Sequence, residues 1–268
     1  MLVDLHIHTT ASDGRLSPRV VVDQAKKCGI GCIAITDHDT LAGYLSLERS
    51  GQSDVTIIPG IEFSTDLPKH EVHILGYGIN SKDAELCRYI ELLAESRRRR
   101  VAKMIAKLQK LSFEIEEVDV ARCAGKAISL GRPHVAQALV DKGYFASSHE
   151  AFEAVLGKNK SAYVPHYKLT PQEVIALIKN SGGVPVLAHP GLVGCDTVVM
   201  QLIRDGIKGL EVYHPKHSRM ESEHYLELAE QYGLIVSGGS DYHAIPGRYP
   251  ETLGEFRIEK AWLRRFPW

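Results

Sequence analysis

Residues 1–14 read MLVDLHIHTTASDG, and this stretch predicts the first strand of the fold. Apolar and polar residues alternate in it with the period of two typical of a β-strand, the apolar ones being Val3, Leu5 and Ile7. His6 and His8 should therefore project from one face of the strand. Two neighbouring imidazoles suggest a metal site, but an isolated H-x-H pair more often simply faces water. The rest of the sequence is needed to distinguish these two interpretations.

Further apolar, β-rich runs recur along the chain. They cover residues 31–36, 55–63, 71–77, 184–189, 207–213 and 233–238. Helical patterns with clear ends lie between most of them; Ser17-Pro18 opens one that Gly29 closes, and Thr170 begins a capping box. Seven strands alternating with helices predict a parallel α/β fold, and closure into a barrel is its most economical form.

The alternation stops between about residues 80 and 166. This stretch has a long amphipathic helical pattern near 82–111 and a second helix after Gly131. We therefore predict a β/α barrel formed by residues 1–79 and 167–268. Residues 80–166 would form a helical insertion domain after the fourth strand, packed over one end of the barrel and contributing to the substrate pocket.

The composition restricts the binding partners and the cellular compartment that we expect. The 268 residues carry a formal net charge of -1, so no general basic field would draw the protein to a DNA duplex or an anionic membrane. No run of eighteen apolar residues and no leader pattern occurs, which predicts a cytoplasmic protein. The five cysteines form no C-x-x-C pair and should be reduced. No protein partner is implied.

Residues that can bind metal ions stand at or just after the predicted strand ends, which meet at one rim of an α/β barrel. They are His6, His8, Asp13, His38, Glu62, His73, His189, Asp241 and His243. Nine such side chains are too many for one tetrahedral zinc and suit two or three divalent ions. The mixture of imidazole and carboxylate favours manganese, with zinc or iron as alternatives.

Six motifs in order carry a family resemblance: HIHTTASDG, ITDHDT, GIEFS, VHILGYG, AHP and SDYH. They resemble the motifs of the PHP (polymerase and histidinol phosphatase) family. The resemblance implies a distorted seven-stranded β/α barrel with a trinuclear metal site. The first ion would be held by His6, His8, Glu62 and Asp241; the second by Glu62, His73 and His189; the third by Asp13, His38 and His243.

More narrowly, the chain resembles the branch containing 3',5'-nucleoside bisphosphate phosphatases and ribonuclease AM. The resemblance implies a metal-dependent phosphoesterase that removes the 3'-phosphate of a nucleoside such as pAp. It also implies 5'-to-3' cleavage of 5'-phosphorylated short RNA, so the partner would be a small nucleotide or short RNA. The residues closest to the chemistry would be Asp13, His38 and His243.

Two alternatives remain open at this point. The protein could act on another small phosphomonoester, such as histidinol phosphate, in which case a 5'-phosphate on the substrate would not matter. From a different functional class, it could be a non-catalytic module with a decayed metal site. All nine candidate ligands are present, which argues against decay.

A substrate phosphate also needs basic contacts. The run Ser96-Arg-Arg-Arg-Arg100 lies in the long predicted helix, whose apolar stripe passes through Arg97. A solvated face and phosphate binding are both consistent with this run; we assign Arg97, Arg98 and Arg100 to binding. The remaining candidates are Arg132 and His134, at a helix start that favours anions, and His217, after the sixth strand.

Overall fold

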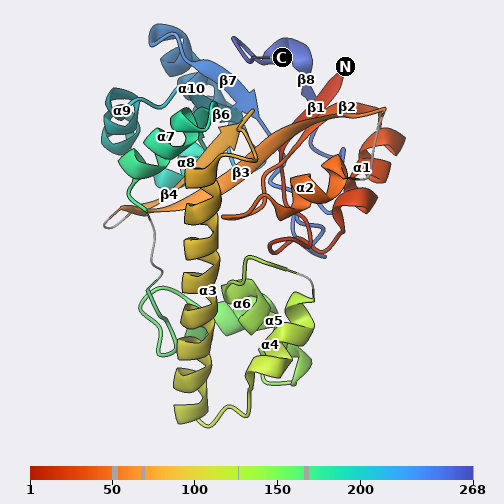
Figure 1. Ribbon diagram of the computed structural model, residues 1–268, viewed down its shortest axis with the longest axis vertical. Coiled ribbons are helices and arrows are strands. Elements are labelled where there is room, and N and C mark those ends of the chain that lie inside the picture. The colour runs from red at the N-terminus through yellow and green to blue at the C-terminus, as the bar shows by residue number, and fades with distance from the viewer. Residues whose placement is uncertain (50–53, 68–69, 126, 166–168, 268) are drawn as a thin grey trace.

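The computed structural model describes residues 1–49, 54–67, 70–125, 127–165 and 169–267 (Figure 1). Its eight-stranded sheet has the order β7-β6-β5-β4-β3-β2-β1-β8. The strands are β1 (Leu2–Ile7), β2 (Ile30–Ile35), β3 (Thr56–Leu67), β4 (His70–Tyr77), β5 (Val184–Leu187), β6 (Gly209–Tyr213), β7 (Ile235–Gly238) and β8 (Ile258–Glu259).

Helices surround this sheet and fill the segment between β4 and β5. They are α1 (Pro18–Lys27), α2 (Ala42–Glu48), α3 (Ala84–Lys110), α4 (Glu117–Ala124), α5 (Arg132–Asp141), α6 (Ser148–Ala151), the π-helix η1 (Phe152–Leu156), α7 (Pro171–Asn180), α8 (Pro190–Val193), α9 (Asp196–Asp205), α10 (Arg219–Gln231) and the 3₁₀-helix η2 (Lys260–Trp262). The predicted distorted barrel is confirmed, and each of the seven predicted strands forms.

The prediction of a fully parallel sheet is wrong for one strand, β4. β4 pairs antiparallel with both β3 and β5, whereas β1, β2 and β3 are parallel to one another and β5, β6 and β7 likewise. The reason is the connection: β3 ends at Leu67 and β4 begins at His70, and so short a link can form only a hairpin. The beginning of β4 therefore lies at the rim where the parallel strands end, and this brings His73 to that rim.

A β-bulge in β1 also departs from simple alternation. The register with β2 shifts between Asp4 and Ile7. Leu5 belongs to the cluster inside the barrel, but Ile7 packs outside with residues of α1 such as Val21. The apolar residues of β1 therefore do not all share one face. His6 and His8 still share a face, because residues two apart in a strand point to the same side, and their Nε2 atoms lie 3.1 Å apart.

The barrel closes between β1 and β7. Ile7 forms a parallel bridge with Tyr242, and β8 pairs antiparallel with β1. Gly239 lies against β1 so closely that a Cβ atom there would stand 2.1 Å from the Cβ of His6. The first metal-ligand candidate and the end of β7 are thus held together by a contact that only glycine permits.

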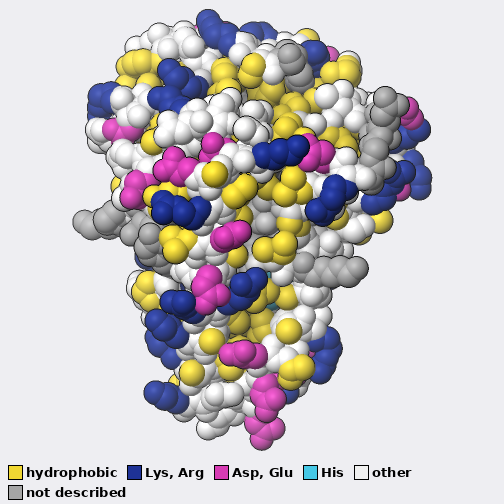
Figure 2. Space-filling model, in the orientation of Figure 1, with side chains coloured by type: hydrophobic (Ala, Val, Ile, Leu, Met, Phe, Trp, Pro, Cys, Tyr) yellow, Lys and Arg dark blue, Asp and Glu magenta, His cyan; other side chains and the backbone are white. Residues whose placement is uncertain are grey.

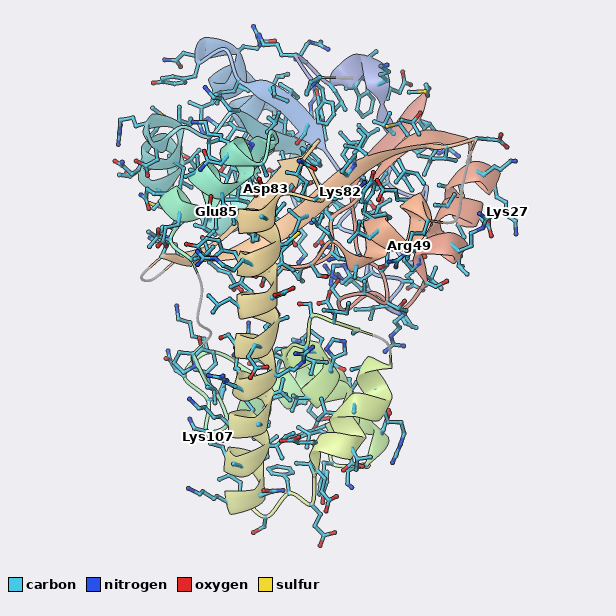
Figure 3. The ribbon with its side chains drawn as sticks, viewed as in Figure 1. Lys27, Arg49, Lys82, Asp83, Glu85 and Lys107 are labelled. Atoms are coloured by element: carbon cyan, nitrogen blue, oxygen red, sulfur yellow. The ribbon has the colours of Figure 1, made fainter. Side chains whose placement is uncertain are left out.

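The helices after β4 build a body with its own core. In Figure 1, α3 extends from the barrel past α4, α5 and α6, and its apolar side packs with them around Met104 and Leu139. Asp83 caps its first turn by accepting from the Leu86 amide at 2.8 Å; Figure 3 labels Asp83 at this end and Lys107 near the other. The insertion bounds 80–166 stay a prediction, and the boundary 166/167 falls outside the described residues.

The surface carries no dominant charge on the face seen in Figure 2, where basic and acidic side chains are interspersed. Within the described part of the chain, no helix has the length and hydrophobicity needed to cross a membrane. A polyanion would therefore have to be held by a local basic site.

Replacing Gly239 with alanine tests the closure. We expect Gly239→Ala to lower the free energy of unfolding by about 1–3 kcal/mol, because the added methyl group overpacks against β1. Gly31→Ala is the control, since its Cβ would meet only the flexible end of Met1, and it should change stability by less than about 0.5 kcal/mol. Equal urea midpoints for the two variants would contradict this account.

Candidate metal centre

The carboxylate of Glu62, at the end of the parallel part of β3, is the centre of a cluster of imidazoles. Its Oε1 lies 2.9 Å from His73 Nδ1 and 3.1 Å from His189 Nε2. Its Oε2 lies 2.9 Å from His38 Nδ1 and 3.2 Å from His8 Nε2. Glu62 is only 1% exposed, so these rings replace water around its charge.

Two further carboxylates extend the cluster. Asp241 Oδ1 lies 3.3 Å from His8 Nε2 and 3.6 Å from His6 Nε2, and Asp13 Oδ1 lies 3.3 Å from His243 Nε2. The structure thus brings all nine metal-binding candidates together. Three groups have ligand atoms within 4.8 Å of one another: His8, Asp13, His38 and His243; His6, His8 and Asp241; and His38, Glu62 and His73.

Backbone strain accompanies two of these residues. His189 has φ 28° and Asp241 has φ 50°, in the left-handed region that non-glycine residues rarely adopt. Neighbouring buried carboxylates hold both turns. Glu211 Oε2 accepts from the His189 amide at 2.7 Å, and Asp4 Oδ1 accepts from the Ser240 amide at 2.9 Å. The strain is thus held by fully buried acids that do not belong to the cluster.

Other buried acids fix ligand orientation. Glu211 Oε1 lies 2.9 Å from His6 Nδ1, which sets the ring so that Nε2 faces the cluster. Asp37 accepts from the Thr9 amide at 2.7 Å and from Ser12 Oγ at 2.6 Å, and so shapes the loop that carries Asp13. Sequence reasoning assigned no role to Asp37, although its place next to His38 in TDHDT was a usable signal.

The electrostatics keep the carboxylates charged despite their burial. Burial alone would raise the pKa of Glu62, but the His38 and His73 imidazoles lower it well below its ordinary value. Burial would lower the pKa of His8, yet Asp241 and Glu62 raise it to about 9. Without a cation, raised pKa values thus favour protons on His6, His8 and His73 that a bound metal would displace, whereas burial lowers the pKa of His189 and His243.

The donor set fits divalent metal ions. Several buried polar atoms of the cluster have no hydrogen-bond partner among the described residues, and they include His8 Nδ1 and His189 Nδ1. Imidazole nitrogens and carboxylate oxygens are the ligands that borderline divalent cations prefer. Folded proteins rarely leave buried polar atoms without hydrogen-bond partners, so these atoms indicate a site for a bound ligand.

A cavity of about 420 Å³ opens beside the cluster. Asp13, His38 and His73 line one part of it, and three arginines of the insertion line another, namely Arg97, Arg100 and Arg132. Of the residues predicted to be closest to the chemistry, Asp13 and His38 thus face the cavity. His243 is 4% exposed and stacks on His8, with ring centroids 4.0 Å apart, so it lies inside the cluster.

The three arginines predicted to bind the substrate point in different directions in the structure. Arg97 is 7% exposed, and Nε donates to Asp39 Oδ2 at 2.8 Å. Arg98 is turned by about 100° around the helix. Its exposed side chain pairs with Glu95 at 3.6 Å, and it does not reach the cavity. Arg100 returns to the inner side and is 9% exposed.

The two predicted substrate histidines also lie outside this cavity. His134 Nδ1 accepts from the Gly131 amide at 3.1 Å, which caps α5. His217 Nδ1 donates to Val212 O at 2.9 Å, and its Nε2 accepts from the Gly191 amide at 3.1 Å. The ring nitrogens of His217 thus join β6 to α8, which is a structural role.

Several cavity residues escaped sequence reasoning. Ser129 and Lys158 line the cavity from irregular segments, where no periodicity marks a facing direction. Glu71 lies in β4, 3.7 Å from His73 Nε2 and 3.8 Å from Arg132 Nη2. The hairpin direction of β4 had to be known before Glu71 could be placed.

Glu211→Gln tests the support of the cluster. The amide keeps the size of the side chain but loses the charge that orients His6, so Mn²⁺ affinity should fall about 10- to 100-fold. Isothermal titration calorimetry measures the affinity, with the exposed Glu230→Gln on α10 as control. Unchanged affinity in Glu211→Gln would show that this carboxylate plays no part in metal binding.

Known proteins resemble the chain over nearly its whole length. The 5'-3' exoribonuclease Rnm of Escherichia coli is 34% identical, covering 91% of this chain and 85% of the relative. The 3',5'-nucleoside bisphosphate phosphatase of Chromobacterium violaceum is 31% identical, over 94% and 90%. The phosphoribosyl 1,2-cyclic phosphate 1,2-diphosphodiesterase of Eggerthella lenta is 33% identical, over 94% and 98%.

A solved structure and a family model agree with these relatives. The crystal structure of a protein of Bifidobacterium adolescentis, described as a candidate metal-dependent phosphoesterase, superposes with a TM-score of 0.87 at 32% identity, over 97% of this chain and 93% of that one. The model of the PHP domain matches residues 4–180. The chain therefore belongs to the PHP domain family and is a metal-dependent phosphoester hydrolase.

Proposed function

We propose that the protein hydrolyses the 3'-phosphate ester of nucleoside 3',5'-bisphosphates such as pAp, and the first internucleotide bond of 5'-phosphorylated short RNA. The observation that carries this proposal is the pair of arginines, Arg100 and Arg132, in the cavity beside the metal centre. Both substrates offer a 5'-phosphate for these arginines and an ester at the 3'-oxygen for the metal centre.

Both guanidinium groups lie near the ring of Tyr163. Their Cζ atoms lie 6.0 Å (Arg100) and 5.8 Å (Arg132) from the centroid of that ring. Burial, followed by the charges of Arg132 and Arg97, lowers the pKa of Arg100 to about 10. Two cations held close in a partly buried cavity repel each other, and a phosphate between them would relieve that repulsion.

Arg97 has a different role in this proposal. Its guanidinium binds Asp39, which is 1% exposed and follows His38 in the chain, and Nη1 donates to Leu130 O at 3.2 Å. Its charge is therefore already neutralised, and it positions the insertion against the barrel. The proposed phosphate contacts are therefore Arg100 and Arg132. Lys158 and Ser129 would assist them, and the buried hydroxyl oxygen of Ser129 has no hydrogen-bond partner among the residues that the structure describes.

The chain's own residues would then orient the reaction. When bound, two or three divalent ions, with manganese favoured, supply charge stabilisation to the phosphoryl oxygens and lower the pKa of water. The nine cluster residues would hold them. With the 5'-phosphate on the arginines, the 3'-ester lies toward Asp13 and His38, the cluster side chains that face this cavity together with His73. Asp13 and His38 would thus stand beside the departing 3'-oxygen, which must take up a proton as it leaves.

A phosphoribosyl cyclic phosphate is the second candidate substrate. The relative with that activity is covered over 98% of its length, and such a molecule also carries a ribose 5-phosphate beside a scissile ester. The two candidates differ in the base, so the ratio of kcat/KM for pAp and for the cyclic ester decides between them. Histidinol phosphate is disfavoured, because it has no second phosphate for Arg100 and Arg132, of which Arg132 otherwise faces the Glu71 carboxylate at 3.8 Å.

Removing one arginine tests the anchor. Arg100→Met should raise KM for pAp about 10- to 100-fold, because a charge-assisted hydrogen bond is lost, and should leave kcat/KM for adenosine 3'-phosphate nearly unchanged. Arg98→Met is the matched control from the outer side of α3 and should behave like the wild type. Equal losses on both substrates in Arg100→Met would refute a 5'-phosphate anchor.

Asp13→Ala tests the third metal position. Asp13 lies 3.3 Å from His243 Nε2 and borders the cavity, so its removal should abolish turnover of pAp without unfolding the protein. Circular dichroism checks the fold, and phosphate release measures turnover. A folded variant that retains its kcat would overturn the three-ion arrangement.

A further inference from the structure

A second cavity lies on the other side of Asp13. It has a volume of about 790 Å³, within the range of about 300–1,000 Å³ typical of ligand sites. The loop after β1, the loop after β7 and helices α4 to α6 enclose it; in Figure 1 these red and blue loops approach the green helices. Asp13 and Ser12 line both this cavity and the arginine cavity, with Pro133 and Phe152 forming the wall between them.

We infer that the second cavity binds the nucleotides of an RNA chain that lie 3' of the scissile phosphate. This inference rests on the proposed function. It distinguishes the two substrate types, because RNA would occupy the second cavity and pAp would not. In pAp the scissile phosphate is terminal, so the second cavity stays empty. In RNA the same phosphate carries the 5'-oxygen of the next nucleoside, which must leave the metal centre in another direction.

The charges of the second cavity suit a phosphodiester chain. Arg248 lines it and also lines the metal centre, where Nη2 donates to Asp241 Oδ2 at 2.6 Å. Arg15 lines it further out; its exposed side chain donates from Nη2 to Gln137 Oε1 at 2.8 Å. Arg248 is thus already paired with Asp241, as Arg97 is with Asp39, whereas Arg15 is bonded to a neutral amide and offers its charge to a phosphate of the chain.

The other residues that line the second cavity suit nucleotide bases and indicate on which side the RNA backbone would lie. Phe152 and Ile245 offer apolar surface, and Gln137 offers an amide. The acidic Asp141 also lines the cavity, where Oδ1 accepts from Gln137 Nε2 at 2.6 Å. A phosphate would avoid that carboxylate, so the backbone should follow Arg15 while the bases face the helices of the insertion.

The chemistry is the same for both substrates. Water adds to phosphorus, the bond from phosphorus to the 3'-oxygen of the first nucleotide breaks, and that oxygen takes up a proton. The phosphate stays on the departing chain as its new 5'-phosphate. The product in the second cavity therefore carries the group that the arginine cavity binds in the next round.

The test compares chain lengths on the Mn²⁺-loaded protein. KM for the first cleavage of 5'-phosphorylated oligoadenylates should fall from the dimer to the tetramer in the wild type. Arg15→Glu should raise KM for the tetramer about tenfold and keep kcat/KM for pAp within about twofold, because pAp does not enter the second cavity. Arg19→Glu, on the exposed side of α1, is the charge-matched control and should leave both substrates unaffected.

A second variant keeps the test independent of charge. Gln137→Trp fills the cavity from α5 and should remove the dependence of KM on length while pAp hydrolysis persists. Normal pAp hydrolysis combined with a length-independent KM in the wild type would overturn this inference alone. A wild-type protein that does not hydrolyse pAp would refute the proposed function and the inference with it.

Discussion

The buried charge of Glu62 is the constraint on which the rest of the structure depends. A carboxylate at 1% exposure is costly unless opposite charges or donors surround it, and here imidazoles from β4 and from the loops after β1, β2 and β5 do so. The hairpin direction of β4 and the left-handed turn at His189 both serve this arrangement. Divalent cations complete it, because they supply the positive charge that protonated histidines otherwise provide.

The ion pair between Arg97 and Asp39 connects helix α3 of the insertion to the loop that carries His38 of the metal centre. Asp39 follows His38, so a movement of α3 relative to the barrel would also move a residue of the metal centre. One continuous helix carries Arg97 and Arg100, and a helix places side chains more rigidly than a loop does. In the proposed function, this rigidity fixes the distance between the proposed phosphate anchor and the scissile ester, which favours substrates with both groups on one ribose.

Much of this architecture could be predicted from the sequence. Strand periodicity gave the seven strands, and metal-competent residues at their ends gave the cluster. Tertiary features could not be predicted. Alternation could not reveal the bulge that separates Leu5 from Ile7, and motif order could not show that β4 is reversed. Helical phase placed Arg97 inward correctly, but only the ion pair with Asp39 showed that its charge is already used. Arg248 and Ser129 lie in irregular segments, where facing directions depend on the assembled fold.

The measurement that tests the central claim most directly is the identity of the phosphate released from pAp. The purified protein would be reconstituted with Mn²⁺ and, in parallel, stripped by a chelator, with AMP as a parallel substrate. The account predicts conversion of pAp to AMP and one equivalent of phosphate only with metal, while AMP is left intact. Release of the 5'-phosphate, or an equal rate on AMP, would contradict an enzyme that anchors one phosphate and cleaves the other.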